Sequence, residues 1–180
     1  MTDAAHYSAF ETLQDGGRIE IRAQRPQDRD GLRAALARMS KESLYHRFFT
    51  VKREFSEQEA HYFLDIDFIK HVALVAIADE NGRPTIVGGC RYIVMQPGVA
   101  EVSFTVIDAY HGRGVGSALM RHIAALAGKA GLKELVADVL GDNAPMLRVF
   151  QRSGLLMSKK LVGTTVDVTL RFPVEDSGRC

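Results

Sequence analysis

The feature that most constrains this chain is a glycine-rich turn between a strand-like run and an amphipathic helix. A β-branched run ends near Val106, three alternate glycines follow at Gly112, Gly114 and Gly116, and a helical apolar pattern begins immediately afterwards. Glycine lets a backbone approach a ligand closely, and the first N–H groups of a helix lack partners inside the helix. With the positive end of the helix dipole, these donors can bind a phosphate or pyrophosphate. The same pattern also suits a turn in which glycine only permits tight packing, so the surrounding sequence must distinguish the two.

The length and composition fit one ordinary globular domain. The chain has 180 residues, 46% of them hydrophobic and 25% charged, and a chain of this size buries about 70% of its unfolded surface. Its 23 basic and 22 acidic residues leave a net charge of +1, so no overall field draws it to nucleic acid or to an anionic membrane. Cys90 and Cys180 are too few for a disulfide framework or a zinc site.

The start of the chain does not resemble a secretory signal, because it lacks a basic region followed by an apolar one. The longest uninterrupted apolar run, Val72–Ala78, is far too short to span a membrane. We therefore expect a soluble, cytoplasmic protein without a nucleic-acid or membrane partner. Residues 1–17 are polar and are expected to be a flexible segment, residues 18–173 one domain, and residues 174–180 a tail.

Hydrophobic periodicity predicts about seven strands and five helices. Ser56 and Glu59 make a capping box, Asn81-Gly82 suits a hairpin turn, and Pro145 suits the first turn of a helix capped by Asp142 or Asn143. The expected strands cover about 18–23, 71–79, 85–95, 99–107, 132–140, 155–162 and 164–172, and the expected helices cover about 28–39, 40–48, 56–64, 115–128 and 143–154. This order predicts a mixed α/β fold with antiparallel strands first and one parallel β-α-β step around the glycine turn.

Two further clusters have structural interpretations. The segment Ser40–Phe49 is dense in aromatic residues beside Arg47 and could line a pocket, although aromatic residues at this density more often belong to the core. Glu57 and His61 lie one helical turn apart, but no second histidine completes a ligand set. We expect these two residues to form a solvated helix pair, and we expect no metal.

The glycine turn does not fit two common nucleotide-binding motifs. A P-loop needs Gly-x-x-x-x-Gly-Lys-Ser/Thr, and no glycine here is followed by lysine in that frame. A dinucleotide-binding fold would use Gly112-x-Gly114, with Asp138 on the next strand. However, the third motif position, residue 117, is serine and not glycine or alanine, and the motif lies too late in the chain for two three-strand halves.

The turn resembles the acyl-CoA motif of the GNAT N-acetyltransferase superfamily. His111-Gly-Arg-Gly-Val-Gly116 is similar to that family's (Gln/Arg)-x-x-Gly-x-Gly/Ala segment. Asn143-x-x-Met146-x-x-Val149-Phe150-x-x-x-Gly154-Leu155 is similar to the family's Asn-x-x-Ala-x-x-Leu-Tyr-x-x-x-Gly-Phe segment, with matching spacing. The resemblance covers residues 18–172 and implies a GNAT fold, a mostly antiparallel sheet with one splayed parallel pair and four to five flanking helices.

The resemblance implies acetyl-CoA as co-substrate and a set of cofactor-binding residues. Backbone N–H groups of the turn would bind the CoA pyrophosphate, the end of the preceding strand would pair with the pantetheine arm, and Asn143 would bond to the cofactor or to the splayed strand. The implied residues are Phe104, Thr105, Val106, Gly112, Arg113, Gly114, Val115, Gly116, Ser117, Asn143 and Phe150.

The chain departs from the family pattern at two positions. His111 replaces the usual glutamine or arginine, a mild change because the site is largely backbone. Phe150 stands where many members carry a tyrosine that protonates the departing CoA thiolate. Either the thiolate therefore leaves unprotonated or another group donates the proton.

Acetyl transfer needs a neutral amine, and an ordinary lysine is almost fully protonated at pH 7, so a general base is required. Glu101 is the candidate, because it lies on the strand before the turn with its side chain on the face of Ser103 and Thr105. The alternative is a surface carboxylate paired with a neighbouring basic residue.

The acceptor is expected to be a primary amine, with a protein lysine as first choice. The segments Ala100–Val106 and Ser40–Phe49 resemble parts of the protein lysine acetyltransferases that modify acyl-CoA synthetases. Two rivals are a small-molecule amine acetyltransferase and a catalytically weak acyl-CoA sensor, the latter suggested by Phe150. The sequence leaves the acceptor's identity, the acyl-chain preference, any regulatory input and the oligomeric state open.

Overall fold

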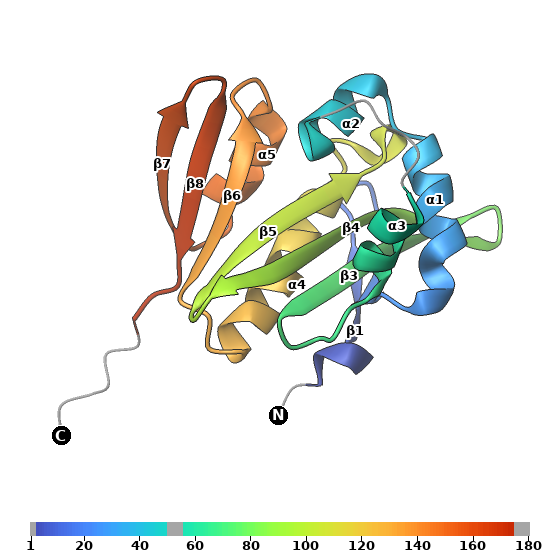
Figure 1. Ribbon diagram of the computed structural model, residues 1–180. Coiled ribbons are helices and arrows are strands. Elements are labelled where there is room, and N and C mark those ends of the chain that lie inside the picture. Colours follow the sequence, from blue (N-terminus) through green and yellow to red (C-terminus); the bar gives the residue numbers. More distant parts are fainter. Residues whose placement is uncertain (1–2, 50–55, 175–180) are drawn as a thin grey trace.

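The computed structural model describes residues 3–49 and 56–174, which form one mixed sheet flanked by helices (Figure 1). The strands are β1 (Ser8–Thr12), β2 (Arg18–Ala23), β3 (His71–Glu80), β4 (Arg83–Gln96), β5 (Val99–Val106), β6 (Glu134–Leu140), β7 (Leu156–Val162) and β8 (Thr165–Arg171). The helices are α1 (Arg29–Ala37), α2 (Lys41–Phe48), α3 (Glu57–Leu64), α4 (Val115–Lys129) and α5 (Ala144–Gln151), with short 3₁₀ turns η1 (Ala4–His6), η2 (Pro26–Asp28) and η3 (Asp108–Tyr110). The predicted α/β class is confirmed.

The sheet has the order β1-β2-β3-β4-β5-β6-β8-β7. Strands β1 to β5 are antiparallel neighbours in chain order, and β6, β8 and β7 form a second antiparallel group. The two groups meet at β5 and β6, the parallel pair that is joined by the crossover helix α4. The predicted β-α-β step therefore lies at the centre of the sheet.

The parallel pair separates after a few residues. Its register begins at Val99 with Glu134 and ends at Glu101 with Val136. Beyond this point β5 continues to Val106 and β6 continues to Leu140, and the two strands diverge (Figure 1). Strand backbones that part in this way leave N–H and C=O groups facing the gap, where a ligand backbone can pair with them.

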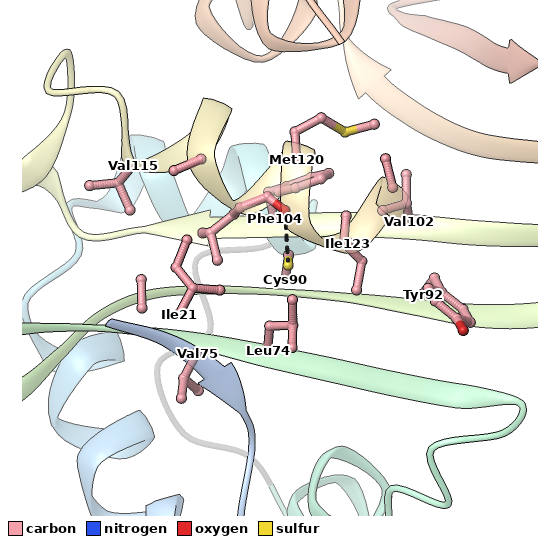
Figure 2. Packing of buried hydrophobic residues seen from close by; sticks show 14 of the residues in the cluster. Ile21, Leu74, Val75, Cys90, Tyr92, Val102, Phe104, Val115, Met120 and Ile123 are labelled. Atoms are coloured by element: carbon pink, nitrogen blue, oxygen red, sulfur yellow. Dashed lines mark hydrogen bonds between the residues drawn. The ribbon is translucent and has the colours of Figure 1, made fainter. Parts of the chain in front are cut away.

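Helices cover both faces of the sheet. Helix α4 packs against β3, β4 and β5 on one face and contacts α5, whereas α1, α2 and α3 lie on the other face (Figure 1). Figure 2 shows Val115, Met120 and Ile123 of α4 above strands β5 and β4. The thiol of Cys90 lies in this core and donates to the Leu119 carbonyl at 3.8 Å, and burial raises its pKa above the ordinary range.

The N-terminal segment differs from the expected loose terminus, because Ser8–Thr12 forms the edge strand β1 and pairs with β2. Contacts with His122 also hold the N-terminal segment against α4. One ring nitrogen of His122 contacts the Tyr7 hydroxyl, and the other contacts the Glu11 carboxylate at 2.7 Å. These partners are more than a hundred residues apart, so the local sequence gives no sign of them. The predicted tail, 174–180, lies outside the described residues except for Val174.

Several local signals are confirmed. Ser56 and Glu59 form the predicted capping box at α3, and Asn81 and Gly82 form the hairpin turn with positive φ angles of 54° and 80°. The expected Glu57–His61 pair is wrong, because the Glu57 carboxylate pairs with Arg29 of α1 at 3.1 Å. In the described part of the chain, no helix is long and apolar enough to cross a membrane.

Candidate active site

The glycine turn lies beside the opening between β5 and β6. Gly112 and Gly114 have positive φ angles of 72° and 92°, which only glycine adopts readily. A Cβ added at either position would meet no described atom within 4 Å, and one added at Gly116 would meet only Val149, at 3.6 Å. Tight packing therefore does not explain these glycines. Gly116 has neither a positive φ nor a crowded position, so neither backbone conformation nor packing requires glycine there.

The start of α4 is open to an anion. Gly114 is the N-cap and offers no side-chain oxygen to the first helical N–H groups. Helix α4 has 15 residues, so its dipole is fully developed at this end. A helix N-terminus of this kind can bind a pyrophosphate, and the backbone site stays a prediction.

The side chains of the turn point elsewhere. The Arg113 guanidinium donates to Asp15 at 2.6 Å and stacks on the Tyr110 ring at 4.3 Å, and Val115 is buried in the core. Asp15 raises the pKa of Arg113 by accepting this hydrogen bond. Arg113 and Val115 therefore offer only their backbone to a ligand, as the resemblance to the acyl-CoA motif implies.

A cleft of about 430 Å³ occupies the opening between the diverging strands. It brings together most of the predicted cofactor-binding residues but not Arg113, Gly114, Val115 or Ser117. The predicted residues in its lining are Phe104, Thr105, Val106, Gly112, Gly116, Asn143 and Phe150.

Asn143 and Phe150 have defined structural partners in the cleft. The Asn143 side-chain oxygen caps α5 by accepting from the Met146 N–H at 3.3 Å, so this oxygen is already engaged before any cofactor binds. Phe150 is 1% exposed and packs edge-to-face on Phe104, with ring centroids 5.8 Å apart. The two rings form an apolar wall of the cleft without a hydroxyl.

A second cavity, of about 700 Å³, lies on the face of the sheet that helices α1 to α3 cover, between these helices and strands β3 to β5. Three residues, Arg47, Ser103 and Thr105, line both cavities. The cleft and the cavity therefore meet at this point of β5. No local sequence pattern indicates the second cavity, because its lining comes from six helices and strands.

Glu101 lies close to the place where the two cavities meet. It is exposed, shares the β5 face of Ser103 and Thr105, and occupies the last paired position before β5 and β6 diverge. It lies outside the lining of both cavities. Its negative charge partly offsets the lowering of the Arg47 pKa that burial and the charge of Arg91 cause.

Two arginines give the second cavity a positive charge. Burial and the charge of Arg91 lower the pKa of Arg47 to about 10, and burial likewise lowers the pKa of Arg91 to about 10. Both guanidinium groups are therefore still charged at pH 7. The segment Ser40–Phe49, for which the sequence favours a core role, has both functions: Leu44 is fully buried, and Arg47 lines the cavity.

Hydrogen bonds fix α2, which carries Arg47, at both ends. Asp108, next to the glycine turn, accepts from the Ser40 N–H at 2.9 Å and from the Ser43 hydroxyl at 3.0 Å. At the other end His46 contacts the Asp142 carboxylate, in the turn before α5, at 3.1 Å. Helix α2 thereby bridges the two sides of the cleft.

Asp138, in the cleft lining, lies opposite Asp167 of β8. Partial burial and the hydrogen bond with Asp167 raise the pKa of Asp138. The folded state therefore holds this proton more tightly than the unfolded chain, and the associated stability is lost as the pH rises through the raised pKa.

We expect Asp138→Asn to raise the melting temperature at pH 7 but not at pH 3, in thermal unfolding followed by circular dichroism. Asp167→Asn should give the same pattern, and equal gains at both pH values would contradict the assignment.

Among the described residues, no group of three or more His, Cys, Asp or Glu side chains is placed to hold a metal ion.

Comparison with known proteins gives the family that the sequence motifs resemble. The model of the acetyltransferase (GNAT) family matches residues 39–155. The acetyltransferase PA5475 of Pseudomonas aeruginosa is 32% identical over 76% of this chain and 74% of its own length. The acetyltransferase Pat of Mycolicibacterium smegmatis is 32% identical over 72% of this chain, but the match spans only 39% of Pat.

The crystal structure of the GNAT domain of S. lividans PAT superimposes with a TM-score of 0.82 and 32% identity, covering 92% of this chain and 97% of that one. The family match over residues 39–155 includes both the glycine turn and the α5 segment, the two motifs that line the cleft. The chain belongs to the GNAT family of acetyltransferases.

Proposed function

We propose that this chain transfers an acetyl group from acetyl-CoA to the side-chain amine of a protein lysine. The observation that carries the proposal is the meeting of two cavities at Ser103, Thr105 and Arg47. A transferase that joins two substrates directly needs two binding sites that share one reaction point.

The cleft between β5 and β6 is proposed to hold acetyl-CoA. Its pyrophosphate would accept hydrogen bonds from the backbone of Gly112–Ser117. Its pantetheine arm would pair with the edge of β5 that β6 leaves over Phe104–Val106, where the Val106 carbonyl also contacts the His111 ring at 2.7 Å. This placement would bring the thioester to the region of Ser103, where the cleft opens to the second cavity.

Glu101 is proposed to be the general base. It would take a proton from the acceptor ammonium, directly or through water, and the neutral nitrogen would attack the thioester carbonyl. The new N–C bond forms, the C–S bond breaks, CoA leaves as a thiolate, and the second proton of the amine nitrogen passes to water or to the thiolate. Arg47 and Arg91 favour the first step, because nearby positive charges disfavour the protonated form of an amine.

The choice of a protein lysine rests on the resemblance of Ala100–Val106 and Ser40–Phe49 to protein lysine acetyltransferases. The cavity supports it against a polyamine acceptor, because its described lining contains arginines and no acidic residue. A cytoplasmic location stays a prediction.

The test is to identify the acceptor. The purified chain and acetyl-CoA are incubated in two parallel reactions. One contains a denatured bacterial protein extract, and the other contains a panel of polyamines, amino acids and aminoglycosides. We expect acetyl-lysine in proteins by mass spectrometry, at levels above an enzyme-free control. Acetylation confined to the small amines would overturn the protein assignment.

An acyl-CoA sensor is the second candidate, and Phe150 is the observation that favours it. A buried phenyl ring cannot protonate the CoA sulfur, but a thiolate with a pKa near 8.5 is a tolerable leaving group.

We therefore expect Phe150→Tyr to preserve or raise kcat, and Phe150→Leu to lower kcat only slightly while reducing stability by about 1 kcal/mol. Steady-state kinetics checks this. Wild-type inactivity toward every amine, together with activity in Phe150→Tyr, would favour the sensor.

A further inference from the structure

The second cavity contains two buried arginines whose charges have no carboxylate partner among the described residues. Arg91 of β4 lies directly opposite Ser103 of β5 in the sheet register, on the cavity face. Arg47 reaches the same cavity from α2. We call Arg47 and Arg91 the arginine pair.

Arg91 is held by neutral groups. Its guanidinium donates to the Phe63 carbonyl at 3.2 Å and to the Gln24 side-chain oxygen at 3.3 Å, contacts the His71 ring nitrogen at 2.9 Å, and lies 4.8 Å from the centre of the Phe63 ring. Burial and the charge of Arg91 lower the pKa of His71, which favours its neutral form. These contacts fix the orientation of Arg91 but leave its positive charge uncompensated.

Arg47 is less well satisfied. Its guanidinium stacks on Phe48, 4.6 Å from the ring centre, and its Nε is buried without a hydrogen-bond partner. It is the one buried side-chain polar atom without a partner in the described part of the chain. Glu101 is near enough to affect Arg47 electrostatically, but no ion pair or hydrogen bond joins them.

An unpaired buried charge is costly, and proteins generally compensate it with an opposite charge. The described lining of the cavity supplies no Asp or Glu, and it adds Arg29 and Arg33. Of these two, Arg29 is already paired with Glu57. No described residue of the lining neutralises the arginine pair, and a bound substrate that enters this cavity can supply the negative charge.

We propose that the arginine pair binds a negatively charged group of the acceptor, next to the lysine that is acetylated. The acceptor would then be a lysine flanked by an acidic residue, and Arg47 would determine this specificity. This inference rests on the proposed lysine acetyltransferase function.

The position of Arg91 favours the acceptor over the phosphates of CoA, whereas Arg47 borders both the second cavity and the cleft. The glycine turn, where the pyrophosphate is proposed to bind, follows the end of β5, whereas Arg91 faces Ser103 three residues before that end, about 10 Å away along the strand. Arg91 lines only the second cavity and not the cofactor cleft.

The experiment uses three fluorescent peptides that differ only in the residues on either side of one lysine: Glu, Gln or Arg. Binding to the full chain is measured by anisotropy with CoA present, and acetylation by CoA release. We expect the Glu peptide to bind about tenfold more tightly than the Gln peptide, and the Arg peptide to bind least, because a charge-assisted contact is gained or lost.

Arg47→Gln should reduce the difference between the Glu and Gln peptides to less than about twofold and raise KM for the Glu peptide. Arg47→Lys should retain part of the preference. The control Arg152→Gln, an exposed arginine at the end of α5, should retain all of it. Arg47→Gln should also fold with an equal or higher melting temperature, because it removes an unpaired buried group.

Equal binding of the three peptides, or a preference that survives in Arg47→Gln, would overturn the inference. So would a loss of acetyl-CoA affinity in Arg47→Gln without a change in peptide preference. Acetylation of all three peptides at equal rates would refute the preference for an acidic flank and leave the proposed acetyltransferase function intact. Selective binding of the Glu peptide without acetylation of any peptide would instead refute the proposed function and keep the anion site.

Discussion

Glu101→Gln should lower kcat by about 10²–10⁴-fold while acetyl-CoA still binds with nearly wild-type affinity. The substitution keeps the shape of the side chain and removes its basicity. Glu101 is exposed at the point where β5 and β6 separate, so the fold should not depend on its charge. Stopped assays of CoA release, with calorimetric titration of acetyl-CoA, measure the two quantities separately.

The pH profile distinguishes a base from a structural carboxylate. If Glu101 accepts the proton, the residual activity of Glu101→Gln should rise steadily with pH, as the fraction of neutral amine rises. Glu20→Gln changes a partly buried strand glutamate that hydrogen-bonds Ser8 and is the matched control; it should leave kcat unchanged. Near-normal turnover of Glu101→Gln at pH 7 would assign the role to another group or to bound water.

Gly116→Ala should weaken acetyl-CoA binding by at least about tenfold, or ~1.4 kcal/mol, without harming the fold. A Cβ at this position would meet only Val149 inside the protein, at an ordinary contact distance of 3.6 Å, and would otherwise point into open space. That space is where the pyrophosphate is proposed to bind. Gly116 is more informative than Gly114, whose positive φ would add backbone strain to any substitution.

The fold should even gain from Gly116→Ala, since alanine in a helix is about 0.5–1 kcal/mol more favourable than glycine. A higher melting temperature with weaker cofactor binding is therefore the expected combination. Gly128→Ala, near the other end of α4, is the control for cofactor affinity alone, because its Cβ would lie 3.3 Å from the Phe172 ring, which must shift by a few tenths of an ångström. Unchanged calorimetric affinity in a folded Gly116→Ala variant would refute the cofactor assignment at the turn.

The features that could be predicted from sequence depend on local physics. Alternation, capping boxes and turn glycines predict most strands and helices, since these signals act within a few residues. The spacing from Gly112 to Asn143 predicts that the glycine turn and the start of α5 lie together, because a β-α-β crossover places both at the same end of the parallel pair. The cofactor cleft follows from these two motifs.

The features that could not be predicted depend on contacts between distant segments. Strand β1 is stabilised by pairing with β2 and by the contacts of Tyr7 and Glu11 with His122, which no local pattern indicates. The second cavity requires Arg47 and Arg91 to converge from a helix and a strand. An arginine between aromatic residues looks the same in sequence whether it covers the core or lines a pocket.

The most direct test of the whole account is the release of free CoA by the purified wild-type chain in the presence of acetyl-CoA and lysine peptides. We predict that a thiol reagent detects CoA at a rate that depends on both substrates, with one acetylated lysine formed for each CoA released. CoA release that is independent of the peptide, or the absence of release with every peptide tested, would contradict acetyl transfer at the junction of the two cavities.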